Sequence, residues 1–334
     1  MNKTDMVFVV HKKEDPNSRL RIYPVAEEMS RRGWKCEVRD VPKGLIGRIR
    51  LILRLFNADI ILLHKKLFNR LELRVLKAIR KKIIFDFDDA IMYTDARRNL
   101  PDSGKFTARF RGIMEITDIA VAGNEYLAKE AGKYCRRVEI LTTPVDVKKY
   151  SPGRPDGRDG VVIGWIGMRG NLFYLEALKP VFRNLAGKFP NISLSVICSD
   201  FPEFEGIKVK KRKWSVEDEL AHLRELDIGL MPLTDDIWSR GKCGFKILQY
   251  FSVGVPVVAS PVGINCDIIK HGVNGFLASS NEEWEARLSE LIADSSLRKK
   301  MGLESRRTVA EKYSLEGYLQ RYVSLIEGLS GVRA

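Results

Sequence analysis

Cysteine is scarce in this chain of 334 residues, and its spacing fits no cross-link. The five cysteines are odd in number and scattered, and no two are spaced as C-x-x-C: Cys36, Cys135, Cys198, Cys243 and Cys266. This pattern argues against a disulfide framework and against a zinc site of the usual ligand spacing. We therefore expect five reduced thiols.

Long apolar runs are missing as well. No run approaches the roughly 18 consecutive apolar residues that a membrane-spanning helix needs. The first ten residues carry charges where a signal peptide would be apolar, so we expect a cytoplasmic protein. The sequence also lacks a helix-turn-helix signature and a basic motif interleaved with aromatic residues, which makes a nucleic-acid-binding module the weakest alternative.

Charge, by contrast, is abundant and uneven. Residues 1–150 contain 32 Lys or Arg and 20 Asp or Glu, whereas the rest of the chain contains 25 and 23. A basic N-terminal half would suit nucleic acid, an anionic membrane surface or an acidic acceptor, or it is simply a solvated surface. Charge alone does not choose among these.

Short apolar runs alternate with segments of helical periodicity along the whole chain. This alternation predicts parallel sheets covered by helices on both faces, and the length predicts two such α/β domains. In the first half we expect strands at 6–10, 35–41, 58–63, 82–87, 119–122 and 138–141 and helices at 19–33, 45–56 and 71–80. In the second half we expect strands at 161–166, 192–198, 228–232, 257–260 and 275–278 and helices at 172–186, 216–226 and 282–329, the last one broken near Tyr313 and Ser314.

Proline and glycine mark the boundary between the halves. Residues 142–159 contain three prolines and two glycines with few large apolar residues, which is typical of a linker. We expect a Rossmann-like domain over 1–145, a linker over 146–159 and a second Rossmann-like domain over 160–314.

The most specific pattern lies in the second half. The segment 241–263, GKCGFKILQYFSVGVPVVASPVG, closely resembles the donor-binding core of the retaining glycosyltransferases of family 4. The resemblance extends to HGVNGFL at 271–277, DIGLMPL at 227–233 and IGWIGMRGN at 163–171. It implies the GT-B fold, in which two Rossmann-like domains have parallel sheets that face each other across a cleft.

The resemblance also assigns roles to the domains. It implies that the domain over 1–145 binds the acceptor and that the domain over 160–314 binds the nucleotide sugar. It further implies that a helix over 315–334 packs back on the first domain. An apolar stripe at helical spacing is available for that contact: Tyr318, Tyr322, Leu325 and Ile326.

A glycine-rich turn is the first candidate for donor binding. A diphosphate requires N–H donors, the positive end of a helix and fixed cations, and all three are available between the expected strand 161–166 and helix 172–186. A plain tight turn is the alternative. The candidates there are Gly167, Met168, Arg169, Gly170 and Asn171, and Ser199 and Pro232 at the ends of two further strands join them.

Lys246 and Gln249 share one face of an expected helix over 245–252 because they are three residues apart. The resembling family has K-x-x-E here. The resemblance therefore makes Lys246 a ligand of the donor phosphates, and Gln249 replaces the glutamate that holds the ribose hydroxyls. An amide still offers an acceptor and two donors. Two solvated helix residues are the alternative.

The acidic pair of many family members is absent. Gly241 and Gln249 stand where those proteins have two glutamates, the first of which touches the donor sugar. Contacts to the sugar are then expected from Lys242, Cys243 and the backbone of that turn. The departure leaves altered activity, or none, as an alternative.

The resemblance implies a metal-independent hexosyltransferase that requires no cofactor. A UDP-, GDP- or ADP-sugar would donate a sugar, with retention at the anomeric carbon, to a glycan or lipid-linked acceptor in polysaccharide or glycoconjugate synthesis. Arg169 and Lys246 would stabilise the charge that builds on the departing diphosphate. A nucleotide-sugar epimerase on the same fold is the rival enzyme.

Candidate acceptor-side residues follow two strands of the first half. His64 follows one expected strand, and Asp88 and Asp89 of the FDFDDA segment follow another, where open α/β sheets bind ligands. A structural histidine and capping of a helix by Asp88 or Asp89 are the alternatives. A Mg²⁺ site on Asp86, Asp88 and Asp89 is less expected, since the chemistry implied by the resemblance needs no metal.

The segment 43–56, KGLIGRIRLILRLF, combines an apolar stripe with cations. Arg50 and Arg54 lie four residues apart on the side opposite the stripe, which consists of Leu45, Ile49, Ile52, Leu53 and Phe56. Such a helix lies on an anionic bilayer or packs on its own sheet with a basic outer face. The basic first half favours peripheral membrane contact, which would suit a lipid-linked acceptor.

Overall fold

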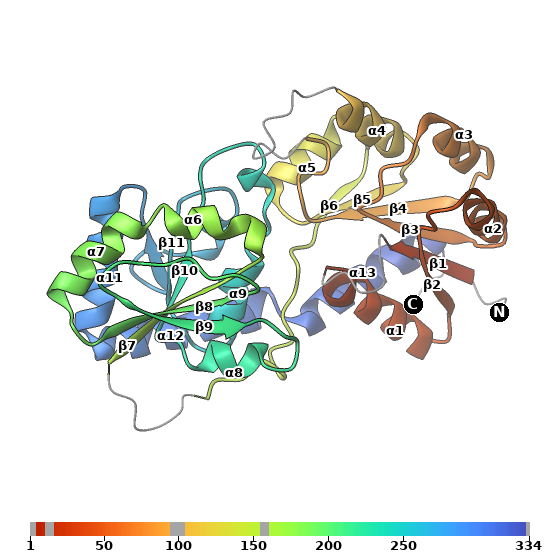
Figure 1. Cartoon of the computed structure of the whole chain (residues 1–334). Helices are drawn as coiled ribbons and strands as arrows, with labels where there is room; N and C mark the ends of the chain where they lie inside the picture. The colour runs from red at the N-terminus through yellow and green to blue at the C-terminus, as the bar shows by residue number, and fades with distance from the viewer. Residues whose placement is uncertain (1–4, 11–16, 94–103, 154–159, 332–334) are drawn as a thin grey trace. The chain divides into compact units, whose positions relative to one another are not determined.

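The computed structural model describes residues 5–10, 17–93, 104–153 and 160–331, which form two compact units (Figure 1). Unit 1 comprises the described residues of 1–144, 236–243 and 315–334. Unit 2 comprises those of 145–235 and 244–314. Residues 236–243, which fall inside the second domain expected from the sequence, therefore pack with unit 1. Each unit is an α/β layer structure around one six-stranded parallel sheet, as the alternation of elements predicted.

The sheet of unit 1 has the strand order β2-β1-β3-β4-β5-β6. Its apolar strands, such as β3 with the sequence IILLH, are buried along their whole length because helices cover both faces. One face packs against α2, α3, α4 and α5, and the other against α1 and α13. The strands are β1 (Asp5–Val10), β2 (Lys35–Asp40), β3 (Ile60–His64), β4 (Lys82–Phe87), β5 (Ile119–Ala122) and β6 (Val138–Ile140). The helices are η1 (Ser18–Ile22), α1 (Tyr23–Arg31), α2 (Leu45–Phe56), α3 (Arg70–Ala78), α4 (Lys105–Met114), α5 (Glu125–Gly132), η4 (Ser239–Gly241) and α13 (Leu315–Ser330).

The sheet of unit 2 has the order β12-β11-β10-β7-β8-β9, which is the doubly wound order of dinucleotide-binding domains. One face packs against α6, α7 and α11, and the other against α8, α9 and α10. The strands are β7 (Val161–Ile166), β8 (Ile192–Cys198), β9 (Lys208–Lys213), β10 (Ile228–Met231), β11 (Val257–Ala259) and β12 (Gly275–Leu277). The helices are η3 (Arg169–Asn171), α6 (Leu172–Glu176), α7 (Lys179–Lys188), α8 (Glu219–Arg224), α9 (Phe245–Ser252), α10 (Asn265–Ile268), α11 (Asn281–Ala293) and α12 (Ser295–Lys312).

The chain departs from the expected elements at helix boundaries. The helix expected over 172–186 is two helices, because Pro180 begins α7 in a first turn, where its missing N–H is tolerated. The long C-terminal helix is interrupted at Asp294 as well as near Tyr313, since the Asp294 side chain caps α12 by accepting from the N–H groups of Ser296 and Leu297. Helices α4, α5 and α10 and strand β9 were not predicted.

Candidate functional site

The strand order of unit 2 reverses between β7 and β10, which are hydrogen-bonded neighbours. In open parallel sheets, ligands bind beyond the carboxyl ends of the strands at such a point. Residues 167–171 follow β7, and Pro232 follows β10. Two of the segments that the sequence identified as donor candidates therefore lie at the position where this topology binds ligands.

The turn after β7 passes close to the ring of Trp165. Trp165 is buried, and a Cβ atom on Gly167 would lie 2.4 Å from Cη2 of that ring. The site therefore requires glycine at 167. The N–H of Gly167 donates to the carbonyl of Ile197 (3.1 Å), and the N–H of Asn171 donates to the carbonyl of Met168 (2.8 Å). The turn is thus tied to the neighbouring strand β8.

Arg169 projects from this turn into solvent. Its side chain is 78% exposed, and its Nε atom lies 3.1 Å from Oδ2 of Asp200, which is 50% exposed. Exposed pairs of this kind contribute little to stability, so the guanidinium is available to a ligand. The neighbouring Met168 is 76% exposed, and Ser199, beside Asp200, is also exposed.

Lys246 lies beside the same tryptophan. It belongs to α9, which begins after Gly244 in the left-handed conformation at φ 63°. The Nζ atom of Lys246 is 5.5 Å from the centroid of the Trp165 ring, a cation–π contact. Because Gly167 packs on that ring too, the structure brings Lys246 and the glycine-rich turn together around one indole.

Tyr250 fixes this arrangement and was missed in the sequence. Its hydroxyl accepts from the N–H of Ile166 (2.9 Å) and donates to the carbonyl of Leu230 (3.4 Å). Burial raises the pKa of Tyr250, so the hydroxyl keeps its proton. Tyr250 thereby links α9 to the ends of β7 and β10. Tyr250 lies four residues after Lys246, so the sequence already placed both on the same face of the helix.

Gln249 is buried, being only 3% exposed, which rules out the reading that it is a solvated helix residue. Among the described residues its Nε2 atom finds no hydrogen-bond partner. A buried amide donor without a partner is costly, so this group is one that a ligand hydroxyl would satisfy.

Lys242 and Cys243 are held by residues of unit 1. The side chain of Asn124 donates to the carbonyl of Lys242 (2.9 Å), and the thiol of Cys243 donates to the carbonyl of Asp88 (3.1 Å). Burial raises the pKa of the Cys243 thiol well above its usual value. The two side chains' contacts with a donor sugar remain a prediction.

Gly241 has a packing reason for lacking a carboxylate. A Cβ atom at this position would lie 2.6 Å from Cβ and 2.9 Å from the backbone N of Ala90. Atoms do not approach this closely, so a glutamate at 241 would displace the chain around Ala90. The departure from the family pattern is therefore built into the packing of unit 1.

A buried ion pair stands at the carboxyl edge of the unit 1 sheet. Arg21 is fully buried and donates to both oxygens of Asp86 (2.9 and 2.8 Å). It also donates to the carbonyl of Leu141 (2.8 Å), and Tyr322 of α13 donates to Asp86 (3.1 Å). Burial alone would lower the pKa of Arg21, but the Asp86 carboxylate outweighs it and raises that pKa. This pair was not predicted from the sequence, because a single buried arginine has no periodicity of its own.

His64, Asp88 and Asp89 lie near that pair, and each contacts another charged side chain. Nε2 of fully buried His64 lies 3.7 Å from Asp86 and 4.0 Å from Asp88, and burial lowers the pKa of His64. Lys65 pairs with Asp88 (2.9 Å) and with Asp89. Burial would raise the pKa of Asp88, but Lys65 and Arg21 bring it to about 2.

The capping alternative for Asp88 and Asp89 is wrong within the described residues. A turn follows them over 91–93, and the next described helix, α4, has Gly104 at its N-cap. The two carboxylates bind Lys65 instead. The described part of the chain contains no group of three His, Cys, Asp or Glu side chains that could hold a metal ion.

Helix α2 carries an apolar face that points away from its sheet. Leu51 and Leu55 are buried, whereas four large apolar side chains of the helix are 47 to 69% exposed: Ile46, Ile49, Leu53 and Phe56. Arg54 pairs with Glu37 of β2 instead of forming an outer basic face. The helix packs on its own sheet, as one alternative expected, but apolar side chains share its outer surface with the exposed Arg50. None of the described helices is apolar over the length that a bilayer crossing demands.

Known proteins that match this chain are glycosyltransferases. Residues 164–294 match the family model of glycosyl transferases group 1. The matched segment begins within β7 and includes the turn at 167–171 and all of α9.

A curated relative matches part of the chain. N-acetyl-alpha-D-glucosaminyl L-malate synthase of Bacillus anthracis is 23% identical over 137 residues, which are 39% of this chain and 36% of that protein. The match thus spans about a third of the length of the relative.

Solved structures match over nearly the whole chain. HepE of Anabaena, in complex with UDP and glucose, has a TM-score of 0.71 at 13% identity and covers 97% of this chain and 100% of its own. A glycosyltransferase of Rickettsia africae has a TM-score of 0.75 at 15% identity and covers 98% and 99%. The chain therefore has the two-domain α/β fold of GT-B glycosyltransferases, as the resemblance implied.

Proposed function

We propose that the protein is a glycosyltransferase that moves a sugar from a nucleotide sugar to an acceptor, with the donor bound by unit 2. The observation that supports this best is the meeting of the Gly167 turn and Lys246 on the Trp165 ring, at the strand-order reversal of unit 2. A diphosphate bound there would meet the N–H groups of the turn and the cations of Arg169 and Lys246.

These cations account for the proposed chemistry. Negative charge builds on the leaving diphosphate as the bond to the sugar breaks, and a preorganised cation stabilises that charge more than it stabilises the intact donor. We propose transfer with retention and without a metal ion. Activity that persists in EDTA, together with an α-linked product from an α-linked donor by NMR, would support both features; loss in EDTA or an inverted product would contradict them.

The donor is the part of the substrate that the residues address most directly. HepE binds UDP and glucose according to its structure, and we propose a UDP-sugar as the donor, ahead of GDP- and ADP-sugars. The unpartnered Nε2 of buried Gln249 would donate to a ribose hydroxyl. The family match favours transfer over the epimerase alternative and over nucleic-acid binding.

A thermal-shift screen of UDP, GDP, ADP and their sugars tests the donor assignment, because a ligand that binds the folded state raises its melting temperature. We expect a shift with UDP and its sugars that the Arg169→Ala/Lys246→Ala variant loses. The Lys299→Ala/Lys300→Ala variant removes two exposed charges from α12 and should keep the shift. A shift of equal size in all three proteins would contradict the proposed site.

We further propose that the acceptor is a glycan or a lipid-linked molecule of polysaccharide or glycoconjugate synthesis, reached at the cytoplasmic face of a membrane. The exposed apolar face of α2 supports this placement, and so does charge: residues 43–80 contain ten Lys or Arg and two Asp or Glu. An apolar helix face among cations fits an anionic lipid surface.

Flotation with anionic vesicles at low salt tests the membrane contact. We expect the protein to float and the Ile49→Ser/Leu53→Ser/Phe56→Ser variant to stay behind. If the wild type remains in solution, or if the apolar residues instead join two copies so that the variant turns a dimer into a monomer, the membrane assignment is wrong.

A further inference from the structure

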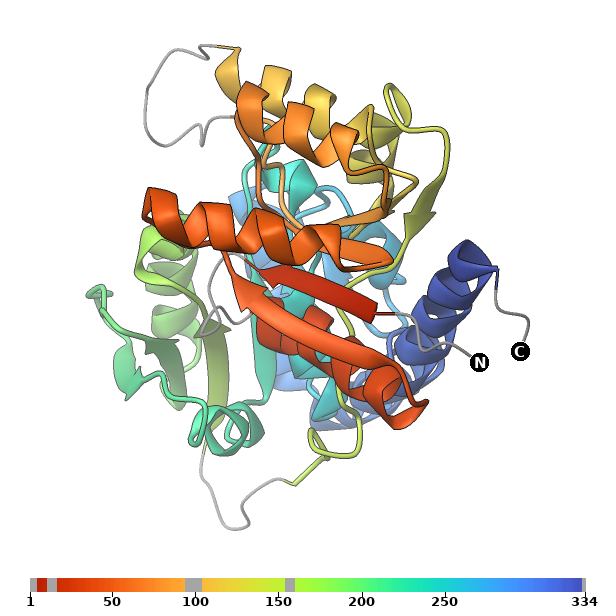
Figure 2. The same cartoon turned by 90° about the vertical axis from the view of Figure 1, so that its right-hand side faces the viewer.

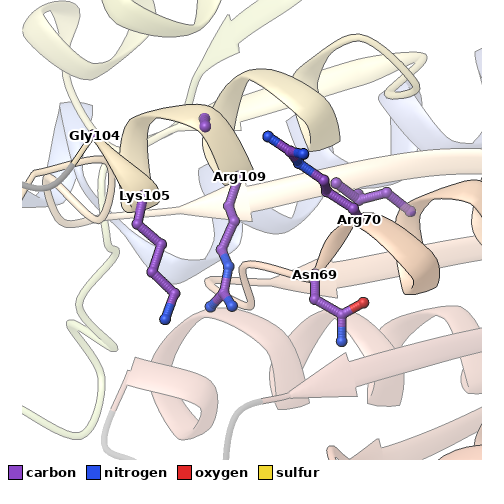
Figure 3. A pocket seen from close by; sticks show the side chains of 7 residues that line it. Asn69, Arg70, Gly104, Lys105 and Arg109 are labelled. Atoms are coloured by element: carbon purple, nitrogen blue, oxygen red, sulfur yellow. The ribbon is translucent and has the colours of Figure 1, made fainter.

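A cavity of about 430 Å³ opens in unit 1 between the N-terminal ends of α3 and α4 (Figure 3). It belongs to neither the switch point of unit 2 nor the buried Arg21 pair. Three of its seven lining residues are cationic and none is acidic: Asn69, Arg70, Leu73, Gly104, Lys105, Ala108 and Arg109.

The cations of the cavity have no anionic partner in the part of the chain that the structure describes. Arg70 comes from α3, and Lys105 and Arg109 share a face of α4 because they are four residues apart. Figure 3 shows Lys105 and Arg109 extending from α4 in the same direction, with Asn69 to the right of Arg109 in this view. Neighbouring like charges repel, so an anion in the cavity would relieve this repulsion.

A fourth cation adds to the positive potential. Burial, Arg48 and Arg109 together lower the pKa of Lys66. Lys66 is therefore close enough to Arg109, which lines the cavity, to be repelled by its charge. The nearby acid, Glu72, is engaged elsewhere: it accepts from Arg48 (2.6 Å) and from the N–H of Asn69 (2.8 Å) in the capping box of α3. Its carboxylate thus forms its hydrogen bonds with Arg48 and Asn69 and not with Arg70, Lys105 or Arg109.

The surroundings of the cavity are apolar and exposed. Leu71 and Phe106 directly follow Arg70 and Lys105 and are 69% and 38% exposed. Helices α2, α3 and α4 lie side by side over one face of the sheet (Figure 2), so the exposed face of α2 continues this layer. Apolar side chains next to unpaired cations match the interface between acyl chains and anionic head groups.

We propose that this cavity binds the anionic phosphate head group of a membrane lipid. The proposal rests on the membrane contact proposed above and adds to it a specific site. Arg70 and Arg109 offer planar forks that suit phosphate oxygens, and Lys105 adds a point charge. Leu71 and Phe106 then contact the lipid chains around the bound head group.

The test compares two vesicle types of equal zeta potential, one with phosphatidic acid and one with oleate as the anionic lipid, both in phosphatidylcholine. We expect the wild type to bind the phosphatidic acid vesicles more tightly. The Lys105→Ala/Arg109→Ala variant should bind them more than about 25-fold more weakly, since each cation near any anionic surface contributes about 1 kcal/mol and direct contact with phosphate adds to this. It should also lose the preference for phosphate over carboxylate.

The Lys299→Ala/Lys300→Ala variant removes the same charge from an exposed helix of unit 2 and should keep the preference. Melting curves of both variants establish that they are folded. If the Lys105→Ala/Arg109→Ala variant weakens on both vesicle types by the same factor, general electrostatics explains the binding and the cavity has no site.

Two further outcomes separate this proposal from its basis. A wild type that binds both vesicle types equally contradicts the cavity site but leaves the membrane contact in place, whereas a wild type that binds neither contradicts both. If glycerol phosphate in solution binds the wild type as tightly as phosphatidic acid vesicles do, the ligand is a soluble phosphate and the lipid assignment is overturned.

Discussion

The two units place charged side chains at the same edge of a similar sheet and use them in opposite ways. At the carboxyl edge of unit 1, Arg21 and Asp86 are both fully buried and neutralise each other. At the carboxyl edge of unit 2, Arg169 is 78% exposed and its partner Asp200 is 50% exposed. A charged pair at a sheet edge therefore stabilises the fold where it is buried, and it remains accessible to a ligand where it is exposed.

Removal of the two arginines should give the largest contrast. Arg21→Ala leaves the Asp86 carboxylate buried without its partner, so we expect the free energy of unfolding to fall by about 3–5 kcal/mol. Arg169→Ala breaks an exposed pair and should change it by less than about 1 kcal/mol. Denaturant unfolding measures both, and equal losses would abolish the distinction between the two edges.

Lys246→Ala should separate ligand binding from stability in unit 2. Loss of a charged hydrogen-bond donor costs about 1.5–3 kcal/mol, so the Kd for the preferred nucleoside diphosphate should rise about 10- to 100-fold. Loss of the contact with Trp165 should lower stability by only about 1 kcal/mol. Calorimetric titration measures the Kd. An unchanged Kd would place the diphosphate elsewhere.

Gly241→Ala tests whether packing in unit 1 excludes larger residues there. Because the added Cβ would meet Ala90, we expect a loss of about 1–3 kcal/mol in the free energy of unfolding. Gly132→Ala in α5 is the matched control, since a Cβ there meets nothing within 4 Å. The control should be neutral or slightly stabilising. If both variants behave alike, packing does not explain the missing glutamate.

Acid should weaken unit 1 through His64. Its pKa is lowered in the folded protein, so the unfolded chain binds a proton more readily below the ordinary pKa of about 6.5. The free energy of unfolding should therefore fall as the pH decreases from 7 to 5, and less so in His64→Gln. Melting curves across this range measure the effect. The same slope in both proteins would assign it to other groups.

Periodicity and motif spacing predicted the position of the glycine-rich turn and every strand of the two sheets except β9, because buried parallel strands are continuous apolar runs and the KVKKRK sequence of β9 is not. Helix α4 escaped notice although Phe110, Ile113 and Met114 have helical spacing, since its cations and the exposed Phe106 interrupt the pattern. Local sequence also could not reveal that residues 236–243 leave their own unit, because that depends on contacts with Ala90 and Asn124.

The sequence identified separate residues of the candidate site but not the residue that joins them. Gly167 and Lys246 were recognisable from motifs, but Trp165, which joins them, appeared only as one apolar residue of a strand. The pairing of Lys65 with Asp88 and Asp89 was equally hidden, since the sequence does not tell which neighbouring charge reaches which carboxylate.

The shared indole of Trp165 gives unit 2 an optical reporter. A diphosphate that draws the Lys246 ammonium away from the ring would alter the electric field at a buried chromophore, and with it the emission spectrum. Donor occupancy would then be readable by fluorescence in unlabelled protein.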